Sequence, residues 1–154
     1  MPTVYVLVGV PGSGKSTWIR NQIWALGLTV VSTDAFVEQE AHRQGKTYNE
    51  VFEDYMPTAV GLMADQVVAA REAGHDIVWD QTSTTVTSRR KKFAMLPNYR
   101  AVAVVFPTPK ADELAMRLAS RPGKIVPDHV VSNMIDQFEQ PTLQEGFDEI
   151  WTAG

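Results

Sequence analysis

The stretch Gly9-Val10-Pro11-Gly12-Ser13-Gly14-Lys15-Ser16 decides the expected fold, because it fits the phosphate-binding pattern G-x-x-x-x-G-K-[ST]. Its glycines let the backbone wrap so that several N–H groups point inward at an anion. The apolar run 4–8 precedes it and a helix-like stretch over about 15–25 follows, so the positive end of that helix faces the same phosphates. The sequence therefore predicts binding of a nucleoside triphosphate, ATP or GTP.

Each position of this loop has an expected partner on the nucleotide. Lys15 is placed to reach the β- and γ-phosphates, and the hydroxyl of Ser16 can ligate Mg²⁺. The predicted nucleotide-binding residues of the loop are Gly9, Pro11, Gly12, Ser13, Gly14, Lys15, Ser16 and Thr17.

Strands alternate with helices along the rest of the chain. The further strand-like runs are 29–32, 76–79, 100–106 and 147–151, and the helix-like runs are 57–73, opened by Pro57, then 85–96, 111–120 and 127–138. Residues 36–55 are polar and read as helical in pieces, with a break near Gly45. This alternation predicts one α/β domain over residues 1–154, with a parallel sheet and helices on both faces. Ligands of such sheets bind beyond the carboxyl ends of the strands.

Two acidic residues are expected at that edge of the sheet. Asp34 follows the second strand and could accept the proton of an attacking hydroxyl group, although an aspartate there could equally be a helix N-cap. Asp80 follows the strand Ile77-Val78-Trp79 and is expected to hold Mg²⁺ together with Ser16, or to orient the acceptor. The alternative for Asp80 is a plain turn residue.

Two arginines predict a mobile lid. Arg117 and Arg121 are four residues apart and share one helix face, and Pro122-Gly123 then breaks the helix. An arginine on such a lid can close on the β- and γ-phosphates, which its planar fork suits better than lysine. We therefore add both to the nucleotide-binding set, with Arg121 as a catalytic residue and Lys124 as a weaker candidate. The alternative is simple complementarity with the helix dipole.

Composition narrows the class of protein. There is no cysteine, which removes disulfides and thiol catalysis, and no signal peptide or membrane-length apolar run is evident. These features fit the cytoplasm, the host cytoplasm if a phage encodes the chain. The net charge of −4 disfavours a protein that coats long DNA. The sequence lacks the Asn-Lys-x-Asp segment by which GTPases recognise guanine, and a motor ATPase normally needs a longer chain. A small ATP-dependent kinase remains.

The same residues resemble the kinase domain of polynucleotide 5′-hydroxyl kinases, in both the bacteriophage and the animal end-repair forms. Positions 9–18 look like the phage loop, and the spacing of Arg117 and Arg121 is similar to that of the phage lid arginines. The segment 138–147, Phe-Glu-Gln-Pro-Thr-Leu-Gln-Glu-Gly-Phe, looks like the animal segment after the lid helix. The likeness covers roughly the whole chain and is weakest over 38–66.

The resemblance implies that Asp34 is the general base for a 5′-hydroxyl and that Lys15, Ser16 and Arg121 serve the phosphates of ATP. It implies an acceptor set of Asp34, Asp80, Thr82 and Arg89, with a DNA or RNA end as the partner and no membrane. One departure matters, because the phage arginine that grips the acceptor phosphate is replaced here by Val37. Arg43, Arg89 or Lys91 could supply that charge.

Two other hypotheses stay open. In the first, the chemistry is the same and the acceptor is a hydroxymethylated DNA base, a nucleoside, a sugar or an antibiotic. In the second, the chain binds nucleotide as an interaction module and transfers no phosphate.

Overall fold

The computed structural model describes residues 1–153, apart from the side chains of residues 23–26. A five-stranded sheet runs through the middle of the molecule in the order β2-β3-β1-β4-β5, and every neighbouring pair is parallel. The strands are β1 (Thr3–Val8), β2 (Thr29–Val31), β3 (Ile77–Trp79), β4 (Arg100–Val105) and β5 (Glu149–Thr152). The predicted parallel sheet is confirmed.

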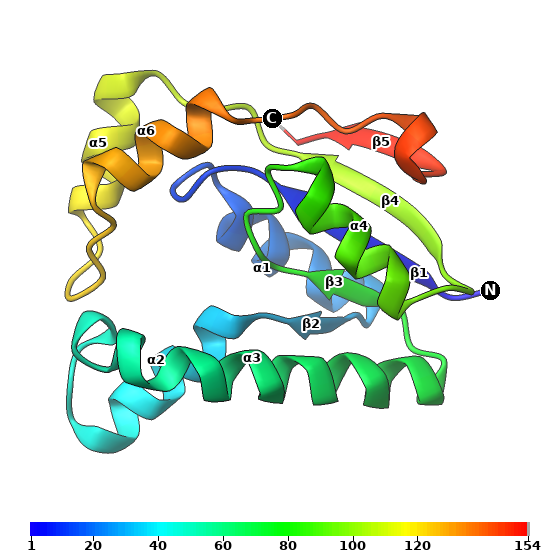
Figure 1. The fold of residues 1–154 in the computed structure, drawn as a ribbon, viewed down its shortest axis with the longest axis horizontal. Coiled ribbons are helices and arrows are strands. Elements are labelled where there is room, and N and C mark those ends of the chain that lie inside the picture. The colour runs from blue at the N-terminus through cyan, green and yellow to red at the C-terminus, as the bar shows by residue number, and fades with distance from the viewer. Residues whose placement is uncertain (154) are drawn as a thin grey trace.

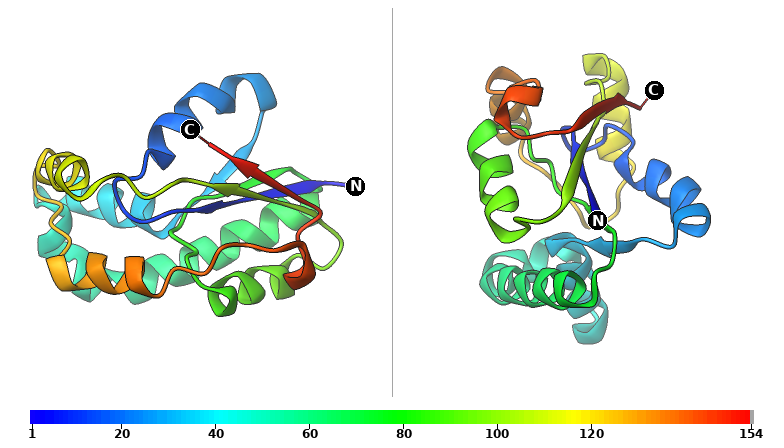
Figure 2. Two further views of the ribbon diagram at one scale, coloured as in Figure 1. Left: turned by 90° about the horizontal axis from the view of Figure 1, so that it is seen from above. Right: turned by 90° about the vertical axis from the view of Figure 1, so that its right-hand side faces the viewer.

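Helices cover both faces of this sheet (Figures 1 and 2). Trp18 and Ile19 of α1 pack on one face, and Met63, Val67 and Phe93 of α3 and α4 pack on the other. The helices are α1 (Lys15–Leu26), α2 (Thr33–Gln44), α3 (Tyr48–Ala73), α4 (Val86–Met95), α5 (Ala111–Ala119) and α6 (Asp128–Asp136). Among the described residues, no helix combines the length and hydropathy that crossing a bilayer requires.

Helix α3 begins earlier than the sequence suggested, and Pro57 does not open it. Thr47 is its N-cap: the Thr47 side chain accepts from the Glu50 backbone, and the Glu50 side chain accepts from the Thr47 backbone. This capping box satisfies the free N–H groups of the first turn, so the helix starts there and carries Pro57 inside it. The break near Gly45 is confirmed, because Gly45 ends α2 in the left-handed conformation at φ 66°.

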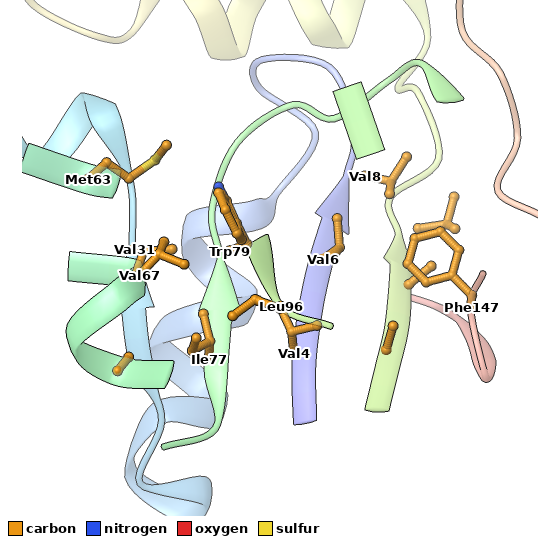
Figure 3. Packing of buried hydrophobic residues seen from close by; sticks show 14 residues of the cluster. Val4, Val6, Val8, Val31, Met63, Val67, Ile77, Trp79, Leu96 and Phe147 are labelled. Atoms are coloured by element: carbon orange, nitrogen blue, oxygen red, sulfur yellow. The ribbon is translucent and has the colours of Figure 1, made fainter. Parts of the chain in front are cut away.

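The core holds the carboxyl ends of the strands in place. Val4, Val6 and Val8 of β1 point to the face that carries Ile77 and Trp79, where α3 closes the cluster (Figure 3). Side chains of a strand alternate between faces, and Leu7 accordingly packs in the second cluster, beneath α1. Burial on both faces explains the continuous apolar run of β1. It also fixes the loops that leave β1, β2 and β3 at one end of the sheet.

Candidate active site

A cleft of about 1620 Å³ lies at the carboxyl ends of the strands. Residues 11–18 line it, together with Asp34, Asp80 and the segment that follows α5. Ligand pockets usually enclose about 300–1,000 Å³, so this cleft has room for a nucleotide and a second molecule beside it. The structure therefore brings together the glycine-rich loop, Asp34 and Asp80 at this edge of the sheet, as the sequence predicts.

The phosphate loop lies between β1 and α1. Its φ angles at Gly12 (+82°) and Gly14 (+105°) are ones that other residues rarely adopt. A Cβ on Gly9 would lie 2.5 Å from Ser13 Oγ and 2.9 Å from Phe106 Cβ, so that position also needs glycine. The spacing of glycines in the motif thus has a steric cause here.

Lys15 is held within this loop by the main chain. Its Nζ donates to the carbonyl oxygens of Gly9 at 2.7 Å and Val10 at 2.8 Å. Burial lowers the pKa of Lys15 to about 8, and the nearby carboxylate of Asp80 partly offsets that effect. Phosphate oxygens bound in the loop would accept hydrogen bonds from the Lys15 ammonium in place of these carbonyls, and would favour the charged form of Lys15.

Asp34 is the second residue of α2, and it does not cap that helix. The cap is Ser32, whose Oγ accepts from the Ala35 backbone at 3.4 Å. Asp34 Oδ1 instead accepts from the Tyr48 hydroxyl at 2.7 Å, and Oδ2 accepts from Lys124 Nζ at 3.2 Å. The N-cap interpretation of Asp34 is therefore excluded, and its carboxylate lines the cleft about half exposed, at 49%.

Asp80 stands at the end of β3, where its backbone N–H donates to Val31 of β2 at 2.8 Å. Its carboxyl group lines the cleft. Burial raises the pKa of Asp80, whereas the ammonium of Lys15 opposes that rise. A cation beside Asp80 would offset the cost of burying its charge.

The donor set in the cleft fits Mg²⁺. Ser16 and Asp80 both line it and offer the oxygen ligands that this ion prefers. Across residues 1–153 no group of three or more His, Asp or Glu residues is arranged to hold a metal. An ion bound mainly by phosphates and water, with one or two protein oxygens, suits this arrangement.

Two arginines reach the cleft from α5 and the loop after it. Arg117 donates to the Gly12 carbonyl at 3.0 Å and to Glu113 at 2.7 Å. Arg121 also lines the cleft, and its Nε is buried without a hydrogen-bond partner among the described residues. A buried donor without a partner is costly, and a phosphate oxygen would satisfy it. The structure thus places both predicted arginines beside the phosphate loop.

Arg89 is not an acceptor ligand, which corrects the expectation drawn from the resemblance. Its side chain is fully buried, and it donates to Glu145 at 2.5 and 3.2 Å and to the Ser83 carbonyl at 2.8 Å. It holds Ser83, which is left-handed at φ 46°, and so fixes the loop after β3. Thr82 of that loop does line the cleft, and its carbonyl accepts from the Gly9 backbone at 2.9 Å.

The other candidates for an acceptor charge are also engaged or outside the cleft. Val37 is fully buried between α2 and α3, so its position cannot reach a ligand. Arg43 pairs with the buried Glu40 of α2, and neither Arg43 nor Lys91 lines the cleft. The cation that does meet Asp34 is Lys124, which belongs to the loop between α5 and α6.

Sequence reasoning missed Tyr48, which binds Asp34 from the first turn of α3. Burial and the hydrogen bond to Asp34 raise the pKa of Tyr48, so it remains a donor. Tyr48 belongs to no recognisable sequence motif. The only local signal is the capping box Thr47-x-x-Glu50, which indicates that a helix begins there.

Comparisons with known proteins agree with this geometry. The family model described as "AAA domain" matches residues 4–141. A shikimate kinase of Mycobacterium marinum is 41% identical over 83 residues, which are 54% of this chain and 44% of that protein. The chain thus spans less than half the length of the curated relatives it matches.

Solved structures share the fold over most of the chain. A protein of Chloroflexus aurantiacus has a TM-score of 0.72 at 18% identity, covering 99% of this chain and 84% of its own. A chain of the Pnkp1/Rnl/Hen1 RNA repair complex has a TM-score of 0.70 at 23% identity, covering 88% of this chain and 43% of its own. With a family match over more than half of its length, the chain belongs to the AAA domain family and has the P-loop kinase fold.

Proposed function

We propose that this protein transfers the γ-phosphate of ATP to a hydroxyl group, and that its acceptor is the 5′-hydroxyl of a polynucleotide. One observation carries the proposal of phosphate transfer. Lys15 of the phosphate loop lines the same cleft as the carboxylate of Asp34, which is not used to cap α2. A protein that only binds nucleotide needs the first of these groups but not the second.

The donor phosphates are the task of the loop and the two arginines. Backbone N–H groups of the loop and Lys15 would bind the β- and γ-phosphates. Arg121, whose Nε has no partner in the described residues, would stabilise charge on the transferring group. Mg²⁺, held by Ser16 and Asp80, would neutralise charge on the phosphate oxygens.

The transfer itself is an in-line displacement at the γ-phosphorus. The acceptor oxygen bonds to that phosphorus, the bond to the β,γ-bridging oxygen breaks, and ADP leaves with the bridging oxygen. Asp34 receives the hydroxyl proton. Its Oδ1 accepts from the Tyr48 hydroxyl at 2.7 Å, which would leave Oδ2, paired with Lys124 in this structure, for the incoming alcohol.

A polynucleotide acceptor is supported by the surface beside Asp34. The rings of Tyr48 and Phe52 line the cleft with centroids 5.4 Å apart, and Phe52 is 40% exposed. Exposed aromatic rings are common stacking surfaces for bases. The sequence resemblance and the shared fold with a chain of an RNA repair complex point the same way.

A small uncharged alcohol is the second candidate, and the charges beside Asp34 favour it. Asp34 and Glu38 line this side of the cleft, and Lys124, which pairs with both, is the cation that faces them. A chain of phosphates would meet more negative than positive charge there. The relatives named shikimate kinase agree with a small acceptor, although shikimate itself carries one carboxylate.

Transfer from labelled ATP separates the two. The panel holds a 5′-hydroxyl DNA oligonucleotide, its RNA equivalent, the same DNA already 5′-phosphorylated, hydroxymethylated DNA, a nucleoside, a sugar and shikimate. We expect label on the 5′-hydroxyl strands and none on the phosphorylated one. Good transfer to a small alcohol with none to either strand would remove the polynucleotide proposal and keep the kinase.

A further inference from the structure

Both carboxylate oxygens of Asp34 are occupied by side chains of this chain. Oδ1 accepts from Tyr48 at 2.7 Å and Oδ2 accepts from Lys124 at 3.2 Å. The first bond leaves the reactive oxygen in place. The second places the Lys124 ammonium on the other oxygen, where it competes with an incoming water molecule for a lone pair that could accept a proton.

Several contacts hold the Lys124 amine at this place. Its Nζ donates to Glu38 at 2.9 Å and lies 4.6 Å from the ring centroid of Tyr48, a cation–π contact. The side chain is only 17% exposed, although it belongs to a loop. A lysine held by two carboxylates and an aromatic ring is a built feature of the cleft.

The backbone on either side of Lys124 is fastened to the start of α3. Asn49 Nδ2 donates to the Ile125 carbonyl at 2.9 Å, and the Ile125 N–H donates to Asn49 Oδ1 at 2.5 Å. The Asn49 N–H donates to Gly123 at 3.0 Å. Gly123 has φ +68°, and a Cβ there would lie 2.7 Å from Thr47. The loop therefore presents Lys124 to Asp34 in one register.

We propose that Lys124 is a specificity-determining residue, whose ammonium on Oδ2 keeps Asp34 from acting as a base toward water, so that the phosphate of ATP goes to the alcohol. This inference rests on the proposed transfer from ATP. In the reaction that Lys124 suppresses, a water oxygen bonds to the γ-phosphorus and the bond to the β,γ-bridging oxygen breaks. Asp34 takes the water proton, and ADP and inorganic phosphate leave.

The contacts beside Lys124 explain how an alcohol differs from water. An acceptor also rests against Phe52 and Ile125, which line the cleft and are 40% and 72% exposed. Binding energy from such remote contacts can displace the amine from Oδ2 and bring the hydroxyl to Asp34. Water makes no such contacts, so the ion pair stays closed against it.

The test is ATP hydrolysis without any acceptor. With Mg²⁺ and ATP alone, Lys124→Met should form ADP about tenfold faster than the wild type, since a free general base contributes about 10²–10⁴-fold when it acts. With the 5′-hydroxyl oligonucleotide added, the wild type should form about one ADP per phosphorylated end. The variant should form several. Lys124→Arg, which keeps the charge, should rise much less.

Three further variants guard the conclusion. Lys91→Met removes an exposed lysine of α4 outside the cleft and should change neither rate. Lys124→Met combined with Asp34→Asn should lose the rise, because the hydrolysis runs through that carboxylate. Asn49→Ala removes the two hydrogen bonds between the Asn49 side chain and Ile125 and so loosens the loop without removing the amine, and about a threefold rise is expected. If thermal unfolding shows that Lys124→Met does not fold, the Asn49→Ala variant tests the inference in its place.

The outcomes are distinct from those of the proposed function. Hydrolysis that is unchanged or slower in folded Lys124→Met would overturn the inference, and so would a loss of transfer with no gain in hydrolysis. If the wild type phosphorylates no member of the acceptor panel, the proposed function fails by itself. The acceptor-free comparison of the two proteins would still decide the role of Lys124.

Discussion

The donor and acceptor sides of the cleft are built in different ways. The donor side is a continuous loop, residues 9–17, whose main chain does the binding and whose glycines meet steric needs at Gly9, Gly12 and Gly14. The acceptor side is assembled from Asp34 of α2, Tyr48 of α3 and Lys124 of a distant loop. The first is encoded by local spacing and the second by long-range contacts, so the two differ in how far a sequence reveals them.

Their charges differ as well. Lys15, Arg117 and Arg121 give the donor side three cations, as the phosphates of ATP require. The acceptor side has Asp34 and Glu38 against Lys124. The cleft is thus polarised, and the variants below should separate its two sides.

The largest effect is expected at Asp34, the proposed general base on the acceptor side. Asp34→Asn should lower kcat for transfer by about 10³-fold, since general bases contribute about 10²–10⁴-fold, while the affinity for ATP changes little. Lys15→Met should lower both kcat and the affinity for ATP, because the Lys15 amine binds the phosphates in the ground state and in the transition state. Initial rates with labelled ATP, together with ATP titration calorimetry, measure the two quantities. A normal kcat in Asp34→Asn would mean that the chain binds nucleotide without this base.

A smaller loss of activity is expected on the donor side. Arg121→Met should lower kcat by about 10²-fold, because charge-assisted hydrogen bonds to the transferring phosphate are worth about 1.5–3 kcal/mol each. Thermal stability should hold or rise, since the change removes a buried Nε that has no partner in the described residues. Steady-state kinetics and thermal unfolding test both halves. An unchanged kcat would leave Arg121 only the alternative role, complementarity with the dipole of α5.

Arg89 sharpens the comparison, because it belongs to neither side. Arg89→Met should cost about 3–5 kcal/mol of unfolding free energy, as expected when one partner of a buried ion pair is removed. The exposed neighbour Arg90 is the matched control, and Arg90→Met should change stability by less than about 0.5 kcal/mol. Urea unfolding measures both. A raised KM for the acceptor in Arg89→Met at normal stability would restore it as a ligand.

The smallest effect is a pH dependence of the donor side alone. The pKa of Lys15 is lowered to about 8, so the free protein loses this proton above that pH, whereas bound phosphates favour the ammonium. The affinity for ATP should therefore be flat below pH 7.5 and about fourfold weaker at pH 8.5, half a unit above that pKa. Lys15→Met should remove the slope. Titration of ATP by calorimetry across this range measures it, and an unchanged slope in the variant would place the titration on another group.

The sequence predicted the donor side well, because each of its features is local. The order of strands and helices and the carboxylates of Asp34 and Asp80 at strand ends followed from periodicity and spacing, and the structure brings Arg117 and Arg121 to the same cleft. What escaped was contact between distant elements. Tyr48 lies 14 residues from Asp34, and Lys124 lies 90 residues from it.

Arg89 was assigned to the site by the sequence analysis but does not belong to it. A basic residue in the run 89–92 predicts a solvated or ligand-binding charge, yet Arg89 and Lys92 are both buried. Glu145, 56 residues away, neutralises Arg89, and Trp79 lies 5.4 Å from the Lys92 amine. No pattern within α4 signals partners that far along the chain. Pro57 misled for a different reason, because the capping box at Thr47, a local signal, was the stronger helix start.

A crystal structure with Mg²⁺, a non-hydrolysable ATP analogue and the acceptor tests the central claim most directly. We expect the Lys15 amine to leave the carbonyls of Gly9 and Val10 for the phosphates. The acceptor hydroxyl should lie about 2.6–3.2 Å from Asp34 and about 3–3.5 Å from the γ-phosphorus. A carboxylate of Asp34 turned away from the nucleotide, with Lys124 still on its Oδ2 and the hydroxyl elsewhere, would contradict the account.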